Sequence, residues 1–359
     1  MKPIVIASTE EYSGKTAFSL GLSHLLTERK LSVGYMKPLG NRLIEENGKL
    51  VDQDASQVKK LLKLTADTSD ISPIRLTPDL IQGVLTGKKN PKKALTEAYS
   101  RISKGKDVVL IEGAGTTGGG LMAGLSEAEI ALQFKARILL VSRYDNDYVV
   151  DRILSAQKLI QSFGKNLLAG VIINDVPKNQ MAHVKGTIVP FLKSKKISVL
   201  GVLPQDPKLR LVSVSAILER LGGQVLTGQN CLDRTVGSFV VGAMSPAYAM
   251  KYFRRTVNKA VITGADRSDL LMTAMETPTQ CLILTGNVPP TSQVLARAQQ
   301  CCIPTILVPQ NTFETVQITE HLLTRLSITD KEKLAYFKNH LRKHINLKEF
   351  SAAFSLPKL

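Results

Sequence analysis

The segment Pro3-Ile4-Val5-Ile6-Ala7-Ser8-Thr9-Glu10-Glu11-Tyr12-Ser13-Gly14-Lys15-Thr16 passes from an apolar run directly into a Gly-Lys-Thr sequence. This pattern predicts a strand over Pro3–Ala7, then a loop, then a helix over Thr16–Arg29. Gly14 would let the backbone approach a phosphate group, and the amides at the helix N-terminus would point at that group. The segment therefore predicts a phosphate-binding loop, although Thr9 stands where the GxxxxGK[ST] pattern has its first glycine.

Two side chains of this loop have predicted roles in nucleotide binding. Lys15 would contact the β- and γ-phosphates, and the hydroxyl of Thr16 would coordinate a magnesium ion. We therefore predict that the chain binds Mg-ATP or a closely related nucleoside triphosphate.

Strand-length apolar segments alternate with helix-length segments as far as about residue 205. After the first strand, the predicted strands are Ser32–Met36, Val108–Ile111, Arg137–Val141, Ala169–Ile173 and Ser198–Val202. The predicted helices between them include Ser56–Leu64, Pro91–Lys104 and Val149–Phe163. The strands are rich in Val and Ile and lack strict alternation, as is typical of parallel strands that are buried on both faces. The pattern therefore predicts an α/β fold with a doubly wound parallel sheet.

Charged side chains stand where three of these elements begin or end. Glu112 closes an apolar strand and is followed by Gly113, so it could present a second magnesium ligand at the carboxyl edge of the sheet. Lys37 follows the second strand and would lie at the same edge, where it could stabilise charge during phosphoryl transfer. Asp54 precedes a helix, where it could either cap that helix or bind metal.

These segments, in this order, resemble the dethiobiotin synthetase family of P-loop proteins. The resemblance implies that Thr16, Asp54 and Glu112 are magnesium ligands, and that Lys15 and Lys37 are catalytic residues. It implies nucleotide contacts by Thr9, Glu10, Ser13, Gly14, Lys15, Thr16, Gly113, Asn174 and Pro204. Asn174 would read the edge of adenine, and Gly201–Pro204 resembles the Gly-x-x-Pro that ends the family's last strand.

The sequence departs from that family at two places. Glu10 stands where the family has Asp, and Thr116–Met122 does not match the family's substrate loop. The resemblance therefore carries over the ATP half of the site and not the substrate half.

A second α/β pattern follows a predicted boundary at residues 212 and 213. Its predicted strands are Phe239–Val241, Lys259–Thr263, Cys281–Thr285 and Thr305–Val308, and its helices are Val214–Leu221, Ala247–Arg254, Asp269–Glu276 and Ser292–Gln300. We predict a smaller domain over residues 213–330 after the P-loop NTPase domain of residues 1–212. For residues 331–359 we expect a basic, helical and solvated tail in preference to one that docks on a partner subunit.

The second pattern resembles the DRTGG domain. Asp266-Arg267-Ser268 and Thr285-Gly286-Asn287 stand for the residues that give this domain its name. Asp266, Arg267 and Gly286 could bind a ligand or form a dimer contact, and a structural ion pair between Asp266 and Arg267 is the alternative.

The two domains in this order resemble the N-terminal regulatory half of long phosphotransacetylases. We expect no acetyl transfer from this polypeptide, because an acetyl-transferring domain would need about 300 further residues. The resemblance favours a regulatory ATP-binding protein linked to acetyl-CoA and acetyl-phosphate metabolism. The alternative is an ATP-dependent ligase that activates a carboxylate, as dethiobiotin synthetase does. Expected partners are a nucleotide, a small carboxylate or acyl metabolite, and further copies of the chain.

Charge and composition narrow the remaining classes. The net charge of +17 indicates an anionic partner, but the basic residues come as scattered pairs, so nucleic acid is an unlikely one. No apolar run is long enough to cross a membrane, and the first residues do not form a secretory signal. The four cysteines lack zinc-site spacing, so we expect a reduced, cytoplasmic protein.

Overall fold

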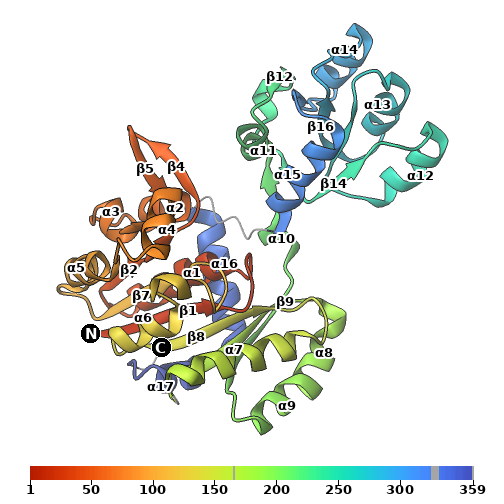
Figure 1. Cartoon of the computed structure of the whole chain (residues 1–359). Helices are drawn as coiled ribbons and strands as arrows, with labels where there is room; N and C mark the ends of the chain where they lie inside the picture. Colours follow the sequence, from red (N-terminus) through yellow and green to blue (C-terminus); the bar gives the residue numbers. More distant parts are fainter. Residues whose placement is uncertain (165, 325–330, 358–359) are drawn as a thin grey trace. The chain divides into compact units, whose positions relative to one another are not determined.

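The computed structural model describes residues 1–164, 166–324 and 331–357. It divides into two compact units, Met1–Gln205 with Ile328–Leu359, and Asp206–Ser327. Each unit is described by itself (Figure 1).

The first unit is built on a parallel sheet of six strands, in the order β10-β9-β8-β1-β7-β2. The strands are β1 (Lys2–Ser8), β2 (Val33–Met36), β7 (Val108–Glu112), β8 (Arg137–Arg143), β9 (Leu168–Val176) and β10 (Val199–Pro204). All six predicted strands are present. The predicted α/β class with a doubly wound parallel sheet is confirmed.

Helices cover both faces of this sheet (Figure 1). They are α1 (Lys15–Glu28), α2 (Gln53–Leu62), α3 (Thr68–Ile71), α4 (Pro78–Leu85), α5 (Lys92–Ser103), α6 (Glu127–Gln133), α7 (Val149–Phe163), α8 (Met181–His183) and α9 (Val189–Ser194). Among the described residues, no helix combines the length and the apolar character that crossing a bilayer requires.

A hairpin between β2 and α2 was not predicted. It consists of β4 (Leu43–Glu46) and β5 (Lys49–Asp52), and a parallel pair of β3 (Leu39–Gly40) and β6 (Ile74–Arg75) lies beside it in the sequence. Its turn is Asn47-Gly48, with φ of 52° and 71°. Asn-Gly is the sequence signal of a two-residue hairpin turn, so this element could have been found from the sequence.

The C-terminal segment corrects the expectation of a solvated tail. It forms α16 (Lys331–His344) and α17 (Leu347–Ala353), and it belongs to the first unit. α16 lies against α1, where a Cβ atom at Gly21 would come within 2.5 Å of Leu341 and 2.9 Å of Phe337 (Figure 1). Phe337 and Phe350 are at most 1% exposed. The basic residues face outward, and the apolar stripe of α16 is buried, so the helix is part of the core.

The second unit has a five-stranded sheet in the order β12-β17-β16-β15-β14. The strands are β12 (Gln224–Thr227), β14 (Ser238–Val241), β15 (Lys259–Gly264), β16 (Thr279–Thr285) and β17 (Thr305–Leu307), and only β12 runs antiparallel to its neighbour. The helices are α11 (Val214–Leu221), α12 (Pro246–Arg255), α13 (Ser268–Met275), α14 (Ser292–Gln300) and α15 (Thr312–Thr324). Residues of α12, α13 and α14 pack into one core and residues of α11 and α15 into another.

The cysteines correct a second expectation. Cys231 and Cys302 form a disulfide, with their Cα atoms 6.3 Å apart, while Cys281 is buried and free and Cys301 is free. The prediction that all four are thiols is wrong for this pair. The two residues are 71 positions apart in the sequence and meet only because β12 and β17 are neighbours in the sheet.

Breaking this disulfide is expected to destabilise the second unit. Because the bond closes a long loop, Cys231→Ser should lower the free energy of unfolding by about 2–4 kcal/mol in chemical denaturation without reductant. Cys301→Ser, which removes a free thiol, is the matched control. Thiol titration of the denatured, non-reduced chain should find two thiols, Cys281 and Cys301. Four thiols would contradict the pairing.

Candidate functional site

The loop Thr9–Gly14 joins β1 to α1 and leaves the start of α1 open. Gly14 occupies the N-cap position with φ of 98°, a left-handed conformation that favours glycine, and no side chain caps the helix. The hydroxyl of Ser13 is buried and has no partner in the described structure. The first amides of a helix need acceptors, and a phosphate group is one that would suit them.

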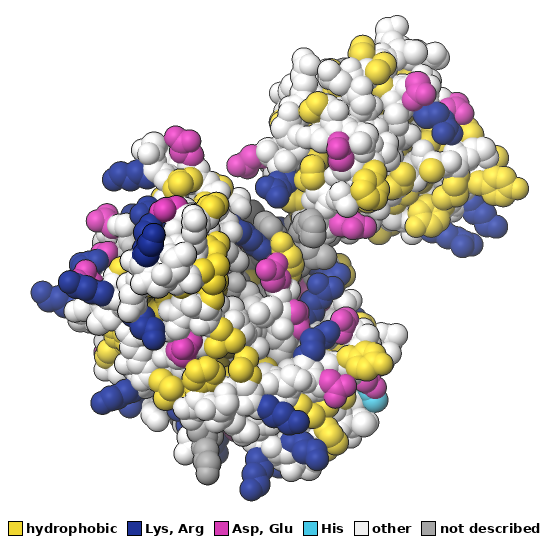
Figure 2. Space-filling model, in the orientation of Figure 1, with side chains coloured by type: hydrophobic (Ala, Val, Ile, Leu, Met, Phe, Trp, Pro, Cys, Tyr) yellow, Lys and Arg dark blue, Asp and Glu magenta, His cyan; other side chains and the backbone are white. Residues whose placement is uncertain are grey.

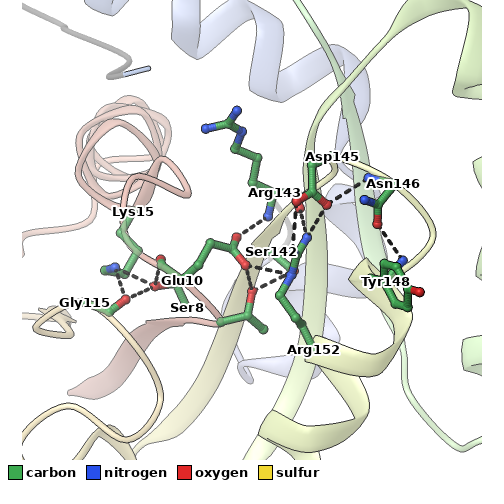
Figure 3. Close-up of polar contacts among 11 residues, drawn as sticks. Ser8, Glu10, Lys15, Gly115, Ser142, Arg143, Asp145, Asn146, Tyr148 and Arg152 are labelled. Atoms are coloured by element: carbon green, nitrogen blue, oxygen red, sulfur yellow. Dashed lines mark hydrogen bonds and ion pairs between the residues drawn. The ribbon is translucent and has the colours of Figure 1, made fainter. Parts of the chain in front are cut away.

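Lys15 lies under this loop. Its Nζ donates to the hydroxyl of Ser8 at 2.5 Å and to the carbonyl oxygen of Gly115 at 2.8 Å (Figure 3). Burial lowers the pKa of its ammonium group, and the carboxylates of Glu127 and Glu112 oppose that effect. Lys15 therefore connects the end of β1 with the glycine-rich segment that follows β7.

Thr16 and Glu112 meet at the carboxyl edge of the sheet. The Thr16 hydroxyl donates to Oε1 of Glu112 at 2.5 Å, and the Tyr35 hydroxyl donates to Oε2 at 2.8 Å. Burial raises the pKa of the Glu112 carboxyl. The structure thus brings two of the three predicted metal ligands together. Tyr35 was not predicted, although it lies two residues before Lys37 on an extended strand and so shares its face.

Lys37 lies between two carboxylates. Its Nζ is 2.6 Å from Asp54 and 3.0 Å from Asp52, and its side chain is 3% exposed. Burial lowers the pKa of Lys37, but the two carboxylates outweigh burial, so the pKa is raised. Asp52 caps α2 by accepting from the Ala55 amide at 3.0 Å. The helix cap is therefore Asp52, and Asp54 is free of that role.

Glu10 anchors the loop to β8 and α7 rather than facing solvent. It accepts from the Arg143 amide at 2.7 Å and lies 3.1 Å from Nε of Arg152, which also binds Asp145 at 2.6 Å (Figure 3). Thr9 contacts the hydroxyl of Ser142 at 2.7 Å. Arg152 was not predicted, because nothing local in the sequence links α7 to residue 10.

The predicted adenine-reading residue, Asn174, lies in β9 near the same loop. Its Nδ2 donates to the carbonyl oxygen of Ser13 at 2.8 Å. Pro204 ends β10, the neighbouring strand, and Gly113 directly follows β7. All predicted nucleotide contacts of the first unit therefore lie at the carboxyl ends of neighbouring parallel strands, where such sheets bind ligands.

Glu127 is a buried carboxyl group that was not predicted. It lies in the first turn of α6, which begins with a capping box of Ser126 and Glu129. A Cβ atom at Gly113 would come within 1.8 Å of its Oε1, so only glycine fits there. Neither carboxyl oxygen has a partner that meets hydrogen-bond geometry. Burial raises the pKa of Glu127 to about 8, although Lys15 opposes the shift.

We expect Glu127 to make the stability of the chain depend on pH. The pKa is about 8 in the folded chain and near its ordinary 4.5 in the unfolded chain, so the protonated carboxyl stabilises the fold fully below pH 4.5 and less as the pH rises through 8. Glu127→Gln should therefore be more stable than wild type at pH 9, by roughly 1–3 kcal/mol. Thermal unfolding from pH 5 to 9 measures this, with exposed Glu97→Gln as control. Parallel curves for wild type and Glu127→Gln would contradict the assignment.

The second unit presents its predicted residues in two turns at the carboxyl ends of β15 and β16. Arg267 donates to the carbonyl oxygen of Met244 at 3.1 Å and lies 3.8 Å from Asp269. Its recorded acidic neighbour is therefore Asp269, and not Asp266 as the ion-pair alternative supposed. Gly286 has φ of 82° and open space around it.

The six-stranded parallel sheet, the loop after β1 and the residues at its carboxyl edge define the first unit as a P-loop NTPase fold. The chain belongs to the AAA_26 family, described as an AAA domain, whose family model matches residues 2–212. A DRTGG domain matches residues 216–322. The resemblances predicted for the two parts are confirmed.

Phosphate acetyltransferases from three bacteria illustrate the relatives of known name. The chain is 25% identical to that of Deinococcus radiodurans over 99% of its own length, 24% identical to that of Pseudomonas putida over 96%, and 22% identical to that of Escherichia coli over 96%. These alignments cover 52%, 51% and 51% of the respective relatives. The chain thus spans about half the length of the curated relatives it matches.

Solved structures with related folds are more distant. The cell division protein MinD of Aquifex aeolicus is 16% identical, with a TM-score of 0.36 over 58% of this chain and 84% of that one. The CBS and DRTGG domains of a Clostridium perfringens pyrophosphatase, complexed with diadenosine tetraphosphate, are 16% identical, with a TM-score of 0.29 over 44% and 74%. These similarities carry no functional argument.

Proposed function

We propose that this chain is a regulatory protein that binds Mg-ATP through its first unit and acts in acetyl-CoA and acetyl-phosphate metabolism. The observation that carries the nucleotide site is the uncapped start of α1 beside the Thr16–Glu112 contact at 2.5 Å. The regulatory role is supported by the order of the two domains and by the phosphate acetyltransferases that share it. We do not extend the proposal to acetyl transfer.

The residues at the edge of the sheet fit a nucleotide with magnesium. Amides at the start of α1 and the ammonium of Lys15 would hold the phosphates, and Thr16 and Glu112 would hold the metal, with Asp54 as the third proposed ligand. In the described part of the chain, no three His, Cys, Asp or Glu side chains could hold a metal ion by themselves. Magnesium would therefore bind together with the phosphates, whose negative charge it would neutralise.

A carboxylate-activating ligase is the second candidate function. It is supported by Lys37, whose ammonium lies at the same edge and could stabilise a transferring phosphoryl group. A pocket of ≈ 890 Å³ between the loops after β8 and β9 weighs against it. Asp145, Asp147 and Asp151 line this pocket, and they would repel a carboxylate substrate.

One experiment separates the two functions. Mg-ATP binding and hydrolysis are measured for wild type and Glu112→Ala, with and without candidate carboxylic acids, and assembly is followed by light scattering. The regulatory function predicts tight binding, slow turnover that no acid stimulates, and an assembly state that changes with nucleotide. An acid that raises turnover in wild type and not in Glu112→Ala would establish the ligase instead. A wild-type chain that does not bind Mg-ATP would sink both.

A further inference from the structure

A second pocket in the first unit lies apart from the phosphate-binding loop. It has a volume of ≈ 640 Å³ and is enclosed by the β4–β5 hairpin, α2 and the segment of α3. The cations that line it are Lys49, Lys59, Lys60, Lys63 and Arg75, and the acids are Glu46 and Asp67. Figure 2 shows basic side chains over this part of the first unit. The volume suits a small-molecule ligand, and the charge suits an anion.

Most of this positive charge is not neutralised by the protein. Lys60 pairs with Glu46 at 2.6 Å. For Lys49, Lys59 and Lys63, the described structure shows no acidic partner within ion-pair distance. Lys59 and Lys63 are four residues apart, and like charges at this spacing repel each other. The dipole of α2 favours cations in its last turn, but it does not account for Lys49, which comes from the hairpin on the other side of the pocket.

The deeper lining carries the groups that an oxyanion needs. Ser56 and Ser72 are 4% and 3% exposed. The Ser56 hydroxyl donates to Glu46 at 2.6 Å, while the Ser72 hydroxyl has no partner in the described structure. Lys60 and Ser56 lower the pKa of the Glu46 carboxyl, so the pocket already stabilises one anionic oxygen. Val51 and Leu64 add an apolar wall for the rest of a ligand.

The pocket is joined to the proposed nucleotide site by short covalent and packing links. β5 lines the pocket and ends at Asp52, which lies 3.0 Å from Lys37. A Cβ atom at Gly40 would touch both the Ser72 hydroxyl, at 2.8 Å, and Cβ of Asp52, at 2.9 Å. A ligand that moved Ser72 or the hairpin would therefore act on the carboxylate that holds Lys37.

We propose that this pocket binds a phosphate-bearing metabolite, separately from the phosphate-binding loop, and that its occupancy is coupled to the nucleotide site through Asp52 and Lys37. The coupling rests on the proposed Mg-ATP function, whereas the binding does not. Lys59 and Lys63 hold the phosphate group, the buried hydroxyls accept or donate the remaining hydrogen bonds, and the apolar wall contacts the organic part.

Titration calorimetry with tripolyphosphate tests the site. The full-length Lys15→Ala chain is used, because its phosphate-binding loop is disabled. Adding Lys59→Ala and Lys63→Asn should weaken tripolyphosphate binding at least about tenfold, which corresponds to the loss of about 1.4 kcal/mol. Asn is chosen because residue 63 has φ of 51°, a conformation that Asn tolerates. The matched control adds Lys93→Ala and Lys104→Ala, which remove the same charge from exposed positions of α5.

An equal affinity in the pocket variant and the matched control would overturn the site. A loss of tripolyphosphate binding in both would reduce it to general charge attraction and overturn it as well. Lys59→Ala alone, at an unstrained helical position, serves if the double change does not fold. Coupling is tested in wild type saturated with Mg-ADP, where the pocket affinity should differ at least about threefold from that of Lys15→Ala. Equal affinities there would overturn the coupling, and failure of wild type to bind Mg-ADP would overturn the proposed function while leaving the pocket result standing.

Discussion

Lys15→Ala is expected to reduce Mg-ATP affinity at least about 100-fold, a loss of roughly 3 kcal/mol. Lys15 is the cation closest to the start of α1, and its Nζ is held at the Ser8 hydroxyl and the Gly115 carbonyl oxygen, below the loop that would enclose the phosphates. Without it, the phosphates would meet the carboxylates of Glu112 and Glu127 with one counter-charge fewer. Equilibrium binding of a fluorescent ATP analogue, followed by competition with ATP, measures the effect.

The same measurement on Lys93→Ala provides the control, because Lys93 is an exposed lysine of α5. A thermal melt of both variants checks that the fold persists. Tight Mg-ATP binding by Lys15→Ala would mean that the phosphates lie elsewhere, and the assignment of the loop would have to be withdrawn.

Phe337→Ala is expected to lower the free energy of unfolding of the first unit by about 3–5 kcal/mol. Phe337 is 1% exposed and lies against Gly21 of α1, where α16 approaches closely. Removing the ring leaves a cavity that neither helix can fill, because Gly21 has no side chain and Leu341 is already packed. Chemical denaturation followed by circular dichroism measures the change.

Phe313→Ala is the matched control, because the same ring on α15 is 70% exposed. Its expected effect is within about 0.5 kcal/mol of zero. If Phe337→Ala cost no more than Phe313→Ala, the C-terminal helix would not be part of the first core.

The sequence predicted the elements whose signals are local. Six apolar segments gave the six strands of the first sheet, and the carboxyl ends of parallel strands meet at one edge by geometry alone. That rule was enough to expect Thr16 and Glu112 near each other, and they are in contact. The Asn47-Gly48 turn carried an equally local signal that was not used. The α/β class and the order of the two domains were determined in the same way, by patterns that lie within a few tens of residues.

Only the tertiary structure decided which distant side chains meet. Local patterning could not tell that α16 would bury its apolar stripe on α1, some 300 residues earlier, because an amphipathic helix has the same pattern whichever surface covers it. The Cys231–Cys302 bond depends on two strands being neighbours in a sheet. The partners of Glu10, the caging of Lys37 by Asp52 and the burial of Glu127 likewise arise from packing. A charge, a thiol or an apolar stripe acquires its role from the groups that the fold places around it, and those contacts are not encoded near it in the chain.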